Sequence, residues 1–397
     1  MVNADSLPAE QGQSPLPSSL SLLIIGGGIM GLWAAVKAER LGIDTLLVDA
    51  DHVGSGASGG LLGALMPHMP DRWSDKKQFQ FDALLSLEDE IARLEAETGL
   101  SAGYRRCGRI IPLPKPHLRT IAERHNQKAA VNWEQQGSRF HWHVLDAPPV
   151  TNWVSDVAGQ AGFVHDTFAA KVSPRALVAA LSHTLTSAKH VRVLEGCGVA
   201  SLDAHGVAHL ANGDSVSFGH AIVSAGHSSF PLLANALRLP TERPLGQGVK
   251  GQAALLKAEI DPAMPVIFLN GLYVVPHEDG TVAIGSTSEE EFAEPFATDA
   301  KLEALIEQAR AIVPALAQAE VVERWAGLRP KAIGRDPMVG ALAEHPRIVA
   351  LTGGFKVSFG LAHCLADAAL CAVQGREMDV PASFTVEDHI RVLDRNN

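Results

Sequence analysis

Residues 22–49 read LLIIGGGIMGLWAAVKAERLGIDTLLVD, and this stretch decides the fold. The apolar run Leu22–Ile25 is long enough for a buried strand and too short for a helix. Gly26, Gly28 and Gly31 follow in G-x-G-x-x-G spacing. The first glycine allows a tight turn, the second lets the backbone approach a pyrophosphate, and the third lets the helix pack closely on the sheet. The free N–H groups at the start of that helix form an anion-binding site.

A second strand, Leu46–Val48, follows the helix and ends on Asp49. An acid at this place, roughly 20 residues after the glycine turn, binds the ribose of a dinucleotide. The strand, turn, helix and terminal acid together predict a site for an adenine dinucleotide. We expect three neighbouring residues to contact the cofactor too, namely Ile29, Met30 and Ala50.

The composition is that of a globular protein of about two domains, with 397 residues, 46% hydrophobic and 19% charged. The formal net charge of −11 makes nucleic acid and anionic membranes poor partners. The four cysteines have no metal-type spacing, so we expect reduced thiols and a cytoplasmic protein. No apolar run approaches the about 20 residues that span a bilayer. Residues 1–20 are rich in Pro, Ser and Gln and predict a disordered tail.

Two further segments are small-residue turns of the kind that brings backbone against a cofactor. The loop Gly54–Gly60 reads GSGASGG, and backbone N–H groups in such a loop can contact a phosphate or a planar ring. The strand His220–Ser224 ends in the pair Ala225 and Gly226, which also permits close approach. We expect cofactor contacts in and beside the first loop from Gly56, Ala57, Ser58 and Gly63.

The end of the sequence contains a second strand–glycine–helix unit. A strand at Arg347–Leu351 is followed by a turn with Gly353 and Gly354, and then by an apolar helix at Phe355–Val373. This unit predicts that the chain leaves the nucleotide-binding domain and later returns to it. Two helix N-termini then meet at one edge of the sheet.

The segments between these units predict a second domain. Residues 78–97 have helical periodicity, residues 104–154 indicate strands and loops, and residues 245–290 indicate a sheet of longer strands. In the middle stretch, His141 and His143 flank a tryptophan, but no third ligand is near. We therefore interpret them as surface histidines beside a buried tryptophan and expect no metal site.

Several motifs resemble the D-amino-acid oxidase superfamily of flavoenzymes, which includes glycine oxidase and sarcosine oxidase. The resemblance covers about residues 22–373. It rests on the glycine motif and the GSGASGG loop, and on Tyr273-Val-Val-Pro276, Asp279–Gly285, Trp325-Ala-Gly-Leu-Arg-Pro330, Asp336–Gly340 and Gly353-Gly-Phe-Lys-Val-Ser-Phe-Gly-Leu361.

The resemblance implies an α/β protein: a Rossmann-like FAD-binding domain with a discontinuous α+β substrate domain built on an antiparallel sheet. We expect residues 21–76, 155–230 and 327–397 in the FAD-binding domain. Residues 77–154 and 231–326 would form the substrate domain.

The resemblance also implies roles for individual residues. Arg329 matches the arginine of W-x-G-x-R-P that clamps the substrate carboxylate, and Tyr273 matches the Y-x-x-P tyrosine that touches it. Lys356 matches a carboxylate-binding lysine of sarcosine oxidase, and Val199 falls near the strand that meets the adenine. We assign Arg329, Tyr273 and Lys356 as catalytic. Arg329 and Lys356 are also expected at the cofactor, with Gly353, Gly354, Phe355 and Val357.

The sequence departs from the family pattern at two places. Pro276 is followed by His277 where the family often has arginine, and no cysteine closely follows Arg329. The second departure predicts FAD that is bound without a covalent link. An arginine together with Lys356 combines features of two subfamilies, so the substrate cannot be copied from either.

The function that we expect is oxidation of the C–N bond of a small amino acid or secondary amine carboxylate, by hydride transfer to flavin N5. The electron acceptor is left open. One alternative is an FAD-binding electron-transfer subunit of a larger amine dehydrogenase complex, and another is a nicotinamide-dependent dehydrogenase. A tRNA-modifying flavin domain, which also occurs in the superfamily, does not suit the acidic charge.

Overall fold

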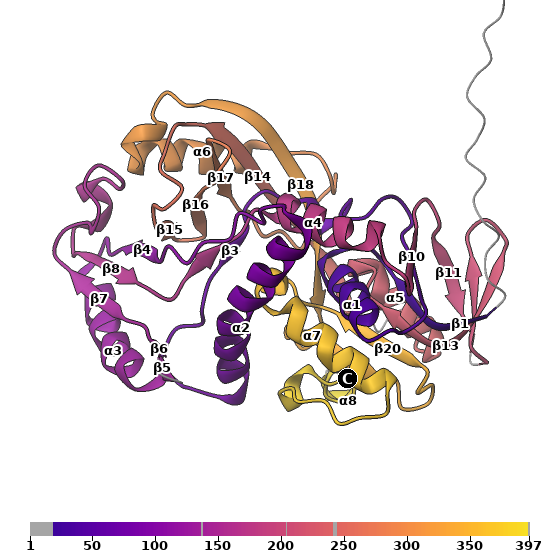
Figure 1. Ribbon diagram of the computed structural model, residues 1–397. Helices are drawn as coiled ribbons and strands as arrows, with labels where there is room; N and C mark the ends of the chain where they lie inside the picture. The colour runs from indigo at the N-terminus through magenta and orange to yellow at the C-terminus, as the bar shows by residue number, and fades with distance from the viewer. Residues whose placement is uncertain (1–18, 136–137, 204, 241–243, 396–397) are drawn as a thin grey trace, which may run out of the picture.

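The computed structural model describes residues 19–135, 138–203, 205–240 and 244–395, which are built around two large sheets (Figure 1). Most of the expected N-terminal tail, residues 1–18, lies outside the described residues, whereas Ser19 and Leu20 belong to the first strand.

The first sheet has a parallel centre. Its order is β10–β2–β1–β13–β12–β11, and β20 also pairs with β13 and with β19. The pairs β10–β2, β2–β1, β1–β13 and β13–β20 are parallel. The strands of this sheet are β1 (Ser19–Ile25), β2 (Thr45–Val48), β10 (Val191–Leu194), β11 (Val199–Leu202), β12 (Val207–Leu210), β13 (Ser215–Val223), β19 (Met338–Ala341) and β20 (Ile348–Thr352).

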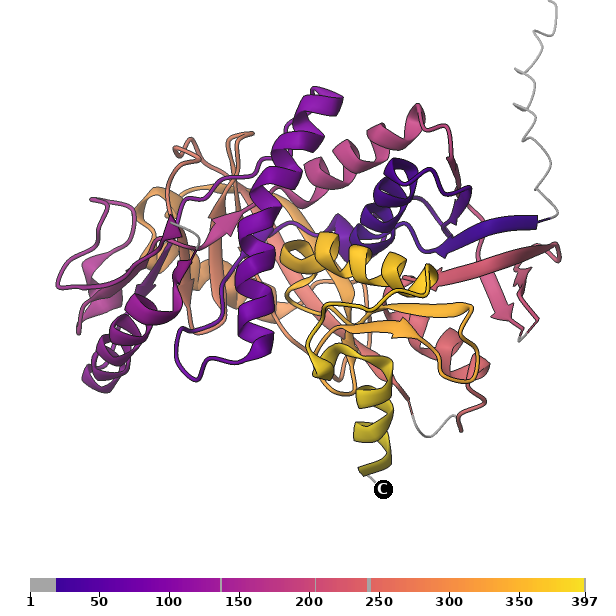
Figure 2. The ribbon, with the colours of Figure 1, turned by 60° about the horizontal axis from the view of Figure 1, so that its bottom comes forward.

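Helices cover both faces of the first sheet. On one face lie α1 (Ile29–Arg40), α4 (Pro174–Thr186) and α7 (Ser358–Val373), with α2 (Asp75–Thr98) packed outside them on α7 and α4; on the other face lie α5 (Ser229–Ala236) and α8 (Val386–Arg395). Figure 2 shows α7 alongside α1, although they come from opposite ends of the sequence. The expected return of the chain to its first sheet is therefore confirmed.

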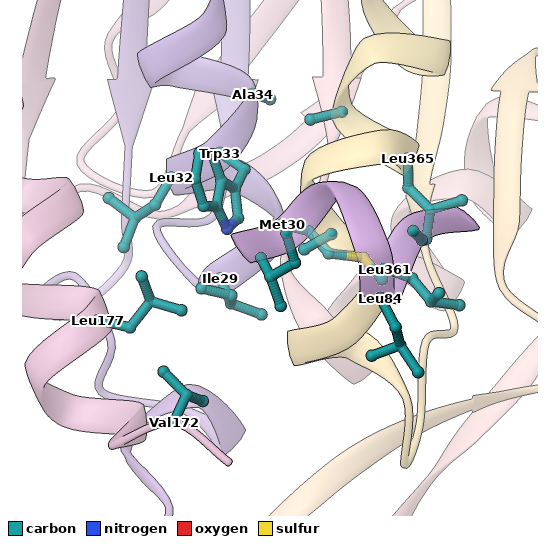
Figure 3. Close-up of a cluster of buried hydrophobic side chains, with 14 of the residues drawn as sticks. Ile29, Met30, Leu32, Trp33, Ala34, Leu84, Val172, Leu177, Leu361 and Leu365 are labelled. Atoms are coloured by element: carbon teal, nitrogen blue, oxygen red, sulfur yellow. The ribbon is translucent and has the colours of Figure 1, made fainter. Parts of the chain in front are cut away.

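A buried cluster joins four of these helices (Figure 3). Trp33 of α1 is fully buried, and Met30 lies near Leu361 of α7. Leu84 of α2 and Leu177 of α4 close the cluster from the other sides. Burial of each large apolar side chain contributes about 1.5–3 kcal/mol, so this cluster fixes the position of α1.

The second sheet is almost wholly antiparallel, in the order β18–β14–β17–β16–β15–β4–β8–β7, with one parallel pair between β15 and β4. The helix α6 (Ala300–Ile312) packs on its outer face. The strands are β4 (Arg109–Pro112), β7 (Trp142–Leu145), β8 (Phe163–Asp166), β14 (Gly246–Lys257), β15 (Val266–Leu269), β16 (Leu272–Pro276), β17 (Thr281–Gly285) and β18 (Glu320–Ala332).

Short elements complete the chain. Two small strand pairs join β3 (Ala64–Leu65) to β9 (Ala170–Lys171) and β5 (Glu134–Gln135) to β6 (Ser138–Arg139). The short 3₁₀ helices are η1 (Ala57–Gly59), η2 (Asp156–Gly159), η3 (Gly226–Ser228), η4 (Pro314–Leu316) and η5 (Ala382–Phe384). Among helices of the described chain, none has the length and apolar character needed to cross a bilayer.

The α/β fold class is confirmed, and three local expectations need correction. Residues 104–154 contain the helix α3 (Pro116–Asn132), which begins at a proline and buries few apolar side chains, so its periodicity is weak. The strand expected at His220–Ser224 is the second half of a longer strand, β13, which begins at Ser215 and ends at Val223. Strand β8 pairs with β4 and β7 in the second sheet, although it falls within residues 155–230 of the expected FAD-binding domain.

The expected surface position of His141 and His143 is confirmed, since both are exposed while Trp142 between them is buried. Among the described residues, no group of three His, Cys, Asp or Glu side chains could hold a metal ion. The four cysteines, all within the described chain, are free thiols.

Replacing Gly31 tests the packing that positions α1. A Cβ at Gly31 would lie 1.9 Å from the carbonyl oxygen of Gly26. We expect Gly31→Ala to lower the free energy of unfolding by about 1–3 kcal/mol, the usual cost of overpacking, as measured by denaturant titration. The control is Gly56→Ala, because a Cβ at Gly56 meets nothing within 4 Å. Equal midpoints for both variants would contradict this account.

Candidate active site

A cavity of about 970 Å³ runs between the carboxyl edge of the first sheet and one face of the second. Asp49 and Val199 line one end of it, and Arg329, Tyr273 and Lys356 line another part. The structure therefore brings the expected nucleotide-binding and catalytic residues into one continuous space.

The turn between β1 and α1 needs its glycines. Gly26 has φ +100°, and a Cβ there would lie 2.6 Å from the Cα of Ala225. The Ser224 hydroxyl donates to the carbonyls of Ile25 and Gly26 at 3.0 and 3.1 Å, which ties the turn to β13. Gly31 packs behind this turn and does not line the cavity.

The start of α1 faces the cavity and suits an anion. Gly28 is the N-cap, with no side-chain cap, and the first turn of α1 has no acidic residue. Ser58 lies close, and its hydroxyl accepts the N–H of Ile29 at 2.8 Å. Gly28, Ile29 and Met30 line the cavity beside this helix end. A helix N-terminus that lacks an acidic partner favours a negatively charged ligand group.

Asp49 is held by backbone at the same edge of the sheet. Its Oδ2 accepts the N–H of Gly27 at 2.6 Å, and its Oδ1 accepts the N–H of Asp51 at 2.9 Å. The carboxylate is therefore fixed where it borders the cavity. Around it the wall contains Ala50 and Val199, as expected, and also Cys197.

The loop after Asp51 contributes a second part of the wall. Gly56, Ala57 and Ser58 line the cavity at η1, and so does Gly63. Gly63 has φ +65°, and a Cβ there would lie 1.8 Å from the carbonyl oxygen of Val172. Glycine at this position is required for the backbone of the loop to pass β9.

The turn before α7 supplies the opposite wall. Phe355, Lys356 and Val357 line the cavity, whereas Gly353 and Gly354 are buried behind it. Gly354 leaves room for Met30, whose Cε would lie 2.4 Å from a Cβ at Gly354. Ala225 and Gly226 border the cavity from η3, as expected.

The lysine lies outside the helix, which corrects one expectation. The helix α7 begins at Ser358, not at Phe355, because Phe355 has φ +46° and interrupts helical geometry. Lys356 is exposed in the turn, with Nζ 5.3 Å from the Phe355 ring centre. Partial burial and then the charge of Arg329 lower the pKa of Lys356.

Arg329 is held rigidly on β18 by the second sheet. Its Nη1 donates to the Ser286 hydroxyl at 3.0 Å, and its Nη2 donates to the Thr287 carbonyl at 2.5 Å. Its Nε finds no hydrogen-bond partner in the described part of the chain. Burial lowers the pKa of Arg329 to about 10, so the group keeps its charge at neutral pH.

A polar network fixes the peptide that holds Arg329. The Thr287 hydroxyl donates to Glu289 at 2.6 Å, and Gln252 donates to the same Glu289 oxygen at 2.8 Å. Lys301 of α6 pairs with Glu289 at 2.6 Å. These contacts leave little freedom for the guanidinium group, which suits a residue that orients a ligand.

Tyr273 lies on the same sheet face as Arg329. Its ring packs against Phe268 with centres 4.7 Å apart. Burial raises the pKa of the Tyr273 hydroxyl, while the charges of Arg109 and Arg329 lower it in part. Two arginines therefore act on one phenol at the floor of the cavity.

Comparison with known proteins places the chain in a family. Residues 21–368 match the family described as FAD dependent oxidoreductase. The chain belongs to this family. The sequence resemblance to the D-amino-acid oxidase superfamily is thereby confirmed, and the chain is an FAD-dependent oxidoreductase.

Individual proteins with similar sequences or structures include oxidases by name. The chain is 27% identical over 361 residues to glycine oxidase of Pseudomonas putida, covering 87% of this chain and 92% of that protein. It is 28% identical over 346 residues to the bifunctional protein ThiO/ThiG of Synechocystis, covering 82% of this chain and 47% of that longer protein. The crystal structure of glycine oxidase from Geobacillus kaustophilus has a TM-score of 0.82 at 20% identity, covering 93% of this chain and 99% of the other.

Sequence reasoning missed several residues that line the cavity of this FAD-dependent oxidoreductase. They come from strands and loops without a local motif: Arg109, Phe268, Ser286 and Phe296. In the sequence, Arg109 is a single charged residue before an apolar run. This pattern is typical of a solvent-exposed residue at the end of a strand. Only the pairing of β4 with β15 brings it to the cavity.

His68 provides a pH test of the cavity wall. It lines the cavity and is partly buried, and burial lowers its pKa from 6.5 to about 4. Between these values the unfolded chain binds a proton that the folded chain does not. The contribution of His68 to stability is therefore fully present above pH 6.5 and is lost as the pH falls toward 4.

We expect His68→Gln to remove part of this dependence, by about 1–3 kcal/mol between pH 7 and pH 4. Denaturant unfolding at the two pH values measures it, with His117→Gln, at an exposed histidine, as the matched control. A stability loss on acidification that is identical in His68→Gln and wild type would show that His68 is not the group concerned.

Proposed function

We propose that this FAD-dependent oxidoreductase oxidises the C–N bond of a small amino acid or secondary amine that carries a carboxylate. The observation that carries the proposal is Arg329, a charged and largely buried group that shares one cavity with the glycine turn of β1 and α1. A buried guanidinium group needs an anion, and its planar fork suits a carboxylate.

The residues around the cavity fit FAD. The start of α1, at Gly28, would hold the pyrophosphate, and Asp49 would hold the ribose next to Val199 at the adenine. The start of α7 lines the cavity and has neither a side-chain cap nor an acidic residue in its first turn, so its free N–H groups would lie beside the flavin ring. In this proposal the first sheet supplies the cofactor half of the site, and the second sheet supplies the substrate half.

When bound, the flavin supplies the redox chemistry, because its N5 accepts a hydride from the carbon that bears the amine. The protein has to hold that carbon in place. Arg329 anchors the carboxylate, and Tyr273 touches the same group. Lys356 adds a second positive charge at the edge of the cavity. A displacement of about 1 Å at the reacting carbon costs on the order of 100-fold in rate, so a rigid anchor matters.

Removing the anchor tests this role. We expect Arg329→Ala to raise the substrate KM about 10- to 100-fold, the effect of a lost hydrogen bond to a charged group. We expect FAD to stay bound in this variant, because Arg329 makes its hydrogen bonds to Ser286 and Thr287, just after β17, and not to the first sheet. Steady-state kinetics and the flavin absorbance of the purified variant measure both effects.

The matched control is Arg324→Ala on the same strand. Arg324 is exposed, pairs with Glu303 at 2.8 Å, and lies an odd number of residues from Arg329, on the opposite face of β18. If Arg329→Ala had the same kinetics as Arg324→Ala, Arg329 would not be part of the substrate site.

We further propose that the flavin is not covalently linked. Of the four cysteines, Cys197 lines the cavity, but it lies beside Asp49, at the expected ribose end. Burial raises the pKa of the Cys197 thiol, which disfavours a reactive thiolate. We expect acid precipitation to release all yellow colour into the supernatant. Colour that stays with the pellet would reveal a covalent bond.

A further inference from the structure

The strand pair β14–β18 has two glycines directly opposite each other in the cavity wall. Gly251 of β14 and Gly327 of β18 are partners in the antiparallel ladder, and both line the cavity. A glycine inside a strand weakens that strand, because it loses much backbone freedom on folding and has no side chain to pack. Such a residue often marks a place where another group lies against the backbone.

The conformation of the backbone does not require these two glycines. Neither Gly251 nor Gly327 has a positive φ, the region that side chains other than glycine rarely adopt. Gly26 and Gly63, in the same cavity wall, have φ of +100° and +65° and differ in this respect. An alanine could therefore follow the course of β14 or β18, and the reason for the glycines lies in the space above the strands.

The space above Gly251 is filled by Arg329. A Cβ at Gly251 would lie 2.7 Å from both Cζ and Nη2 of Arg329 and 3.1 Å from its Nε, and these are the three nearest atoms. Nη2 also donates to the carbonyl of Lys250, the preceding residue of β14, at 3.4 Å. The guanidinium group therefore lies on the backbone of β14, with no room for a methyl group between them.

The opposite glycine makes room for a second flat group. A Cβ at Gly327 would lie 2.4 Å from Cζ2 and 2.6 Å from Cη2 of Trp325. Trp325 pairs with Ala253 and Arg329 pairs with Val249, so each side chain reaches along the strands toward the glycine pair between them. Opposite Cα atoms in such a ladder are about 4.5–5.5 Å apart. The indole ring and the guanidinium group consequently lie side by side on the glycine pair.

The other contacts of the guanidinium group show what an added methyl group would disturb. Nη1 donates to the Ser286 hydroxyl at 3.0 Å, Nη2 donates to the Thr287 carbonyl at 2.5 Å, and Cζ lies 5.4 Å from the ring centre of Phe355. With a Cβ at Gly251, the group would have to retreat from 2.7 Å to about 3.4 Å, where ordinary contact begins. Hydrogen bonds tolerate only a narrow range of distances, so this shift would strain the bonds that orient Arg329.

We propose that Gly251 is a positioning residue for Arg329. The absence of a side chain at Gly251 sets the depth and direction of the guanidinium group, and through it the place of the substrate carboxylate. This inference rests on the proposed function, in which Arg329 anchors that carboxylate. A displacement of about 1 Å in such an anchor is costly, which gives a physical reason for a glycine inside β14.

The first test measures equilibrium binding to the FAD-loaded enzyme and needs no turnover. Propionate and the uncharged, similarly shaped propionamide are titrated separately, and the flavin absorbance reports each dissociation constant. We expect the wild-type enzyme to prefer propionate at least about 10-fold, the effect of hydrogen bonds to a charged group. Gly251→Ala should lower this preference about 3- to 10-fold, because those bonds are partly lost. An unchanged preference would overturn the proposal.

The matched control is Gly248→Ala on the same strand. Gly248 does not line the cavity, and its φ is not positive. A Cβ there would first meet Cδ1 of Leu328 at 3.2 Å, which is the end of a flexible side chain. We expect Gly248→Ala to keep the wild-type preference for propionate. An equal loss in Gly248→Ala and Gly251→Ala would mean that any methyl group added to β14 disturbs the site, and Gly251 would have no special role.

A double-mutant cycle on stability tests whether Gly251 acts through Arg329. We expect Gly251→Ala to lower the denaturant midpoint in the wild-type background, because the added methyl group overpacks the site. In the Arg329→Ala background the displaced group is gone, so the same substitution should not lower the midpoint. Equal losses in the two backgrounds would contradict the proposal. If Gly251→Ala alone does not fold, the double variant should fold, and its failure would also overturn the proposal.

The binding and turnover results together separate this inference from the proposed function. A wild-type enzyme that binds propionate no better than propionamide would refute the carboxylate anchor and this inference with it. If an amine bleaches the flavin and Gly251→Ala keeps the propionate preference, only the inference fails. If the preference depends on Gly251 but no amine bleaches the flavin, the positioning role stands and the amine-oxidising function is refuted.

Discussion

The fold depends on one close approach of two backbone segments. Gly31 of α1 lies against the carbonyl of Gly26, with no room for even a methyl group between them. This contact sets the helix directly on the end of β1, and the Ser224 hydroxyl locks the turn to β13. The helix start therefore points its N–H groups into the cavity. The position of α7 follows, because it packs along α1.

The second constraint is electrostatic and belongs to the other sheet. A charged guanidinium group at Arg329 is tolerated in a largely buried place because Ser286 and Thr287 accept from it and Glu289 lies behind it. Thr287 and Glu289 are themselves bonded to Gln252 of β14, and Glu289 also pairs with Lys301 of α6. Polar groups of the second sheet and its loops therefore fix the orientation of the Arg329 guanidinium group, which can bind an anion in the cavity from one direction only.

The first sheet could be predicted from the sequence far better than the second. The glycine turns at Gly26 and Gly353 are local signals, because a short segment of chain determines whether a side chain fits. The roles of Arg329 and Tyr273 rest on family motifs and stay predictions, while the structure shows that both side chains line one cavity. Arg109 could not be found, because its position depends on the pairing of β4 with β15, whose residues are far apart in sequence. The helix α3 was missed because its buried face is small and polar.

The return of the chain to its first sheet has a consequence for biosynthesis. The strand β20 and the helix α7 come near the end of the chain, yet β20 pairs with β13 and α7 packs on α1. During translation, β1, β2 and β13 leave the ribosome well before these partners do. The wall at Lys356 is absent until then, so the cavity closes late in synthesis. A chain that stops before β20 keeps the glycine turn between β1 and α1 but lacks the cavity wall formed by Leu351, Thr352 and residues 355–360. The complete cavity therefore forms only after β20 and the turn before α7 have been synthesised.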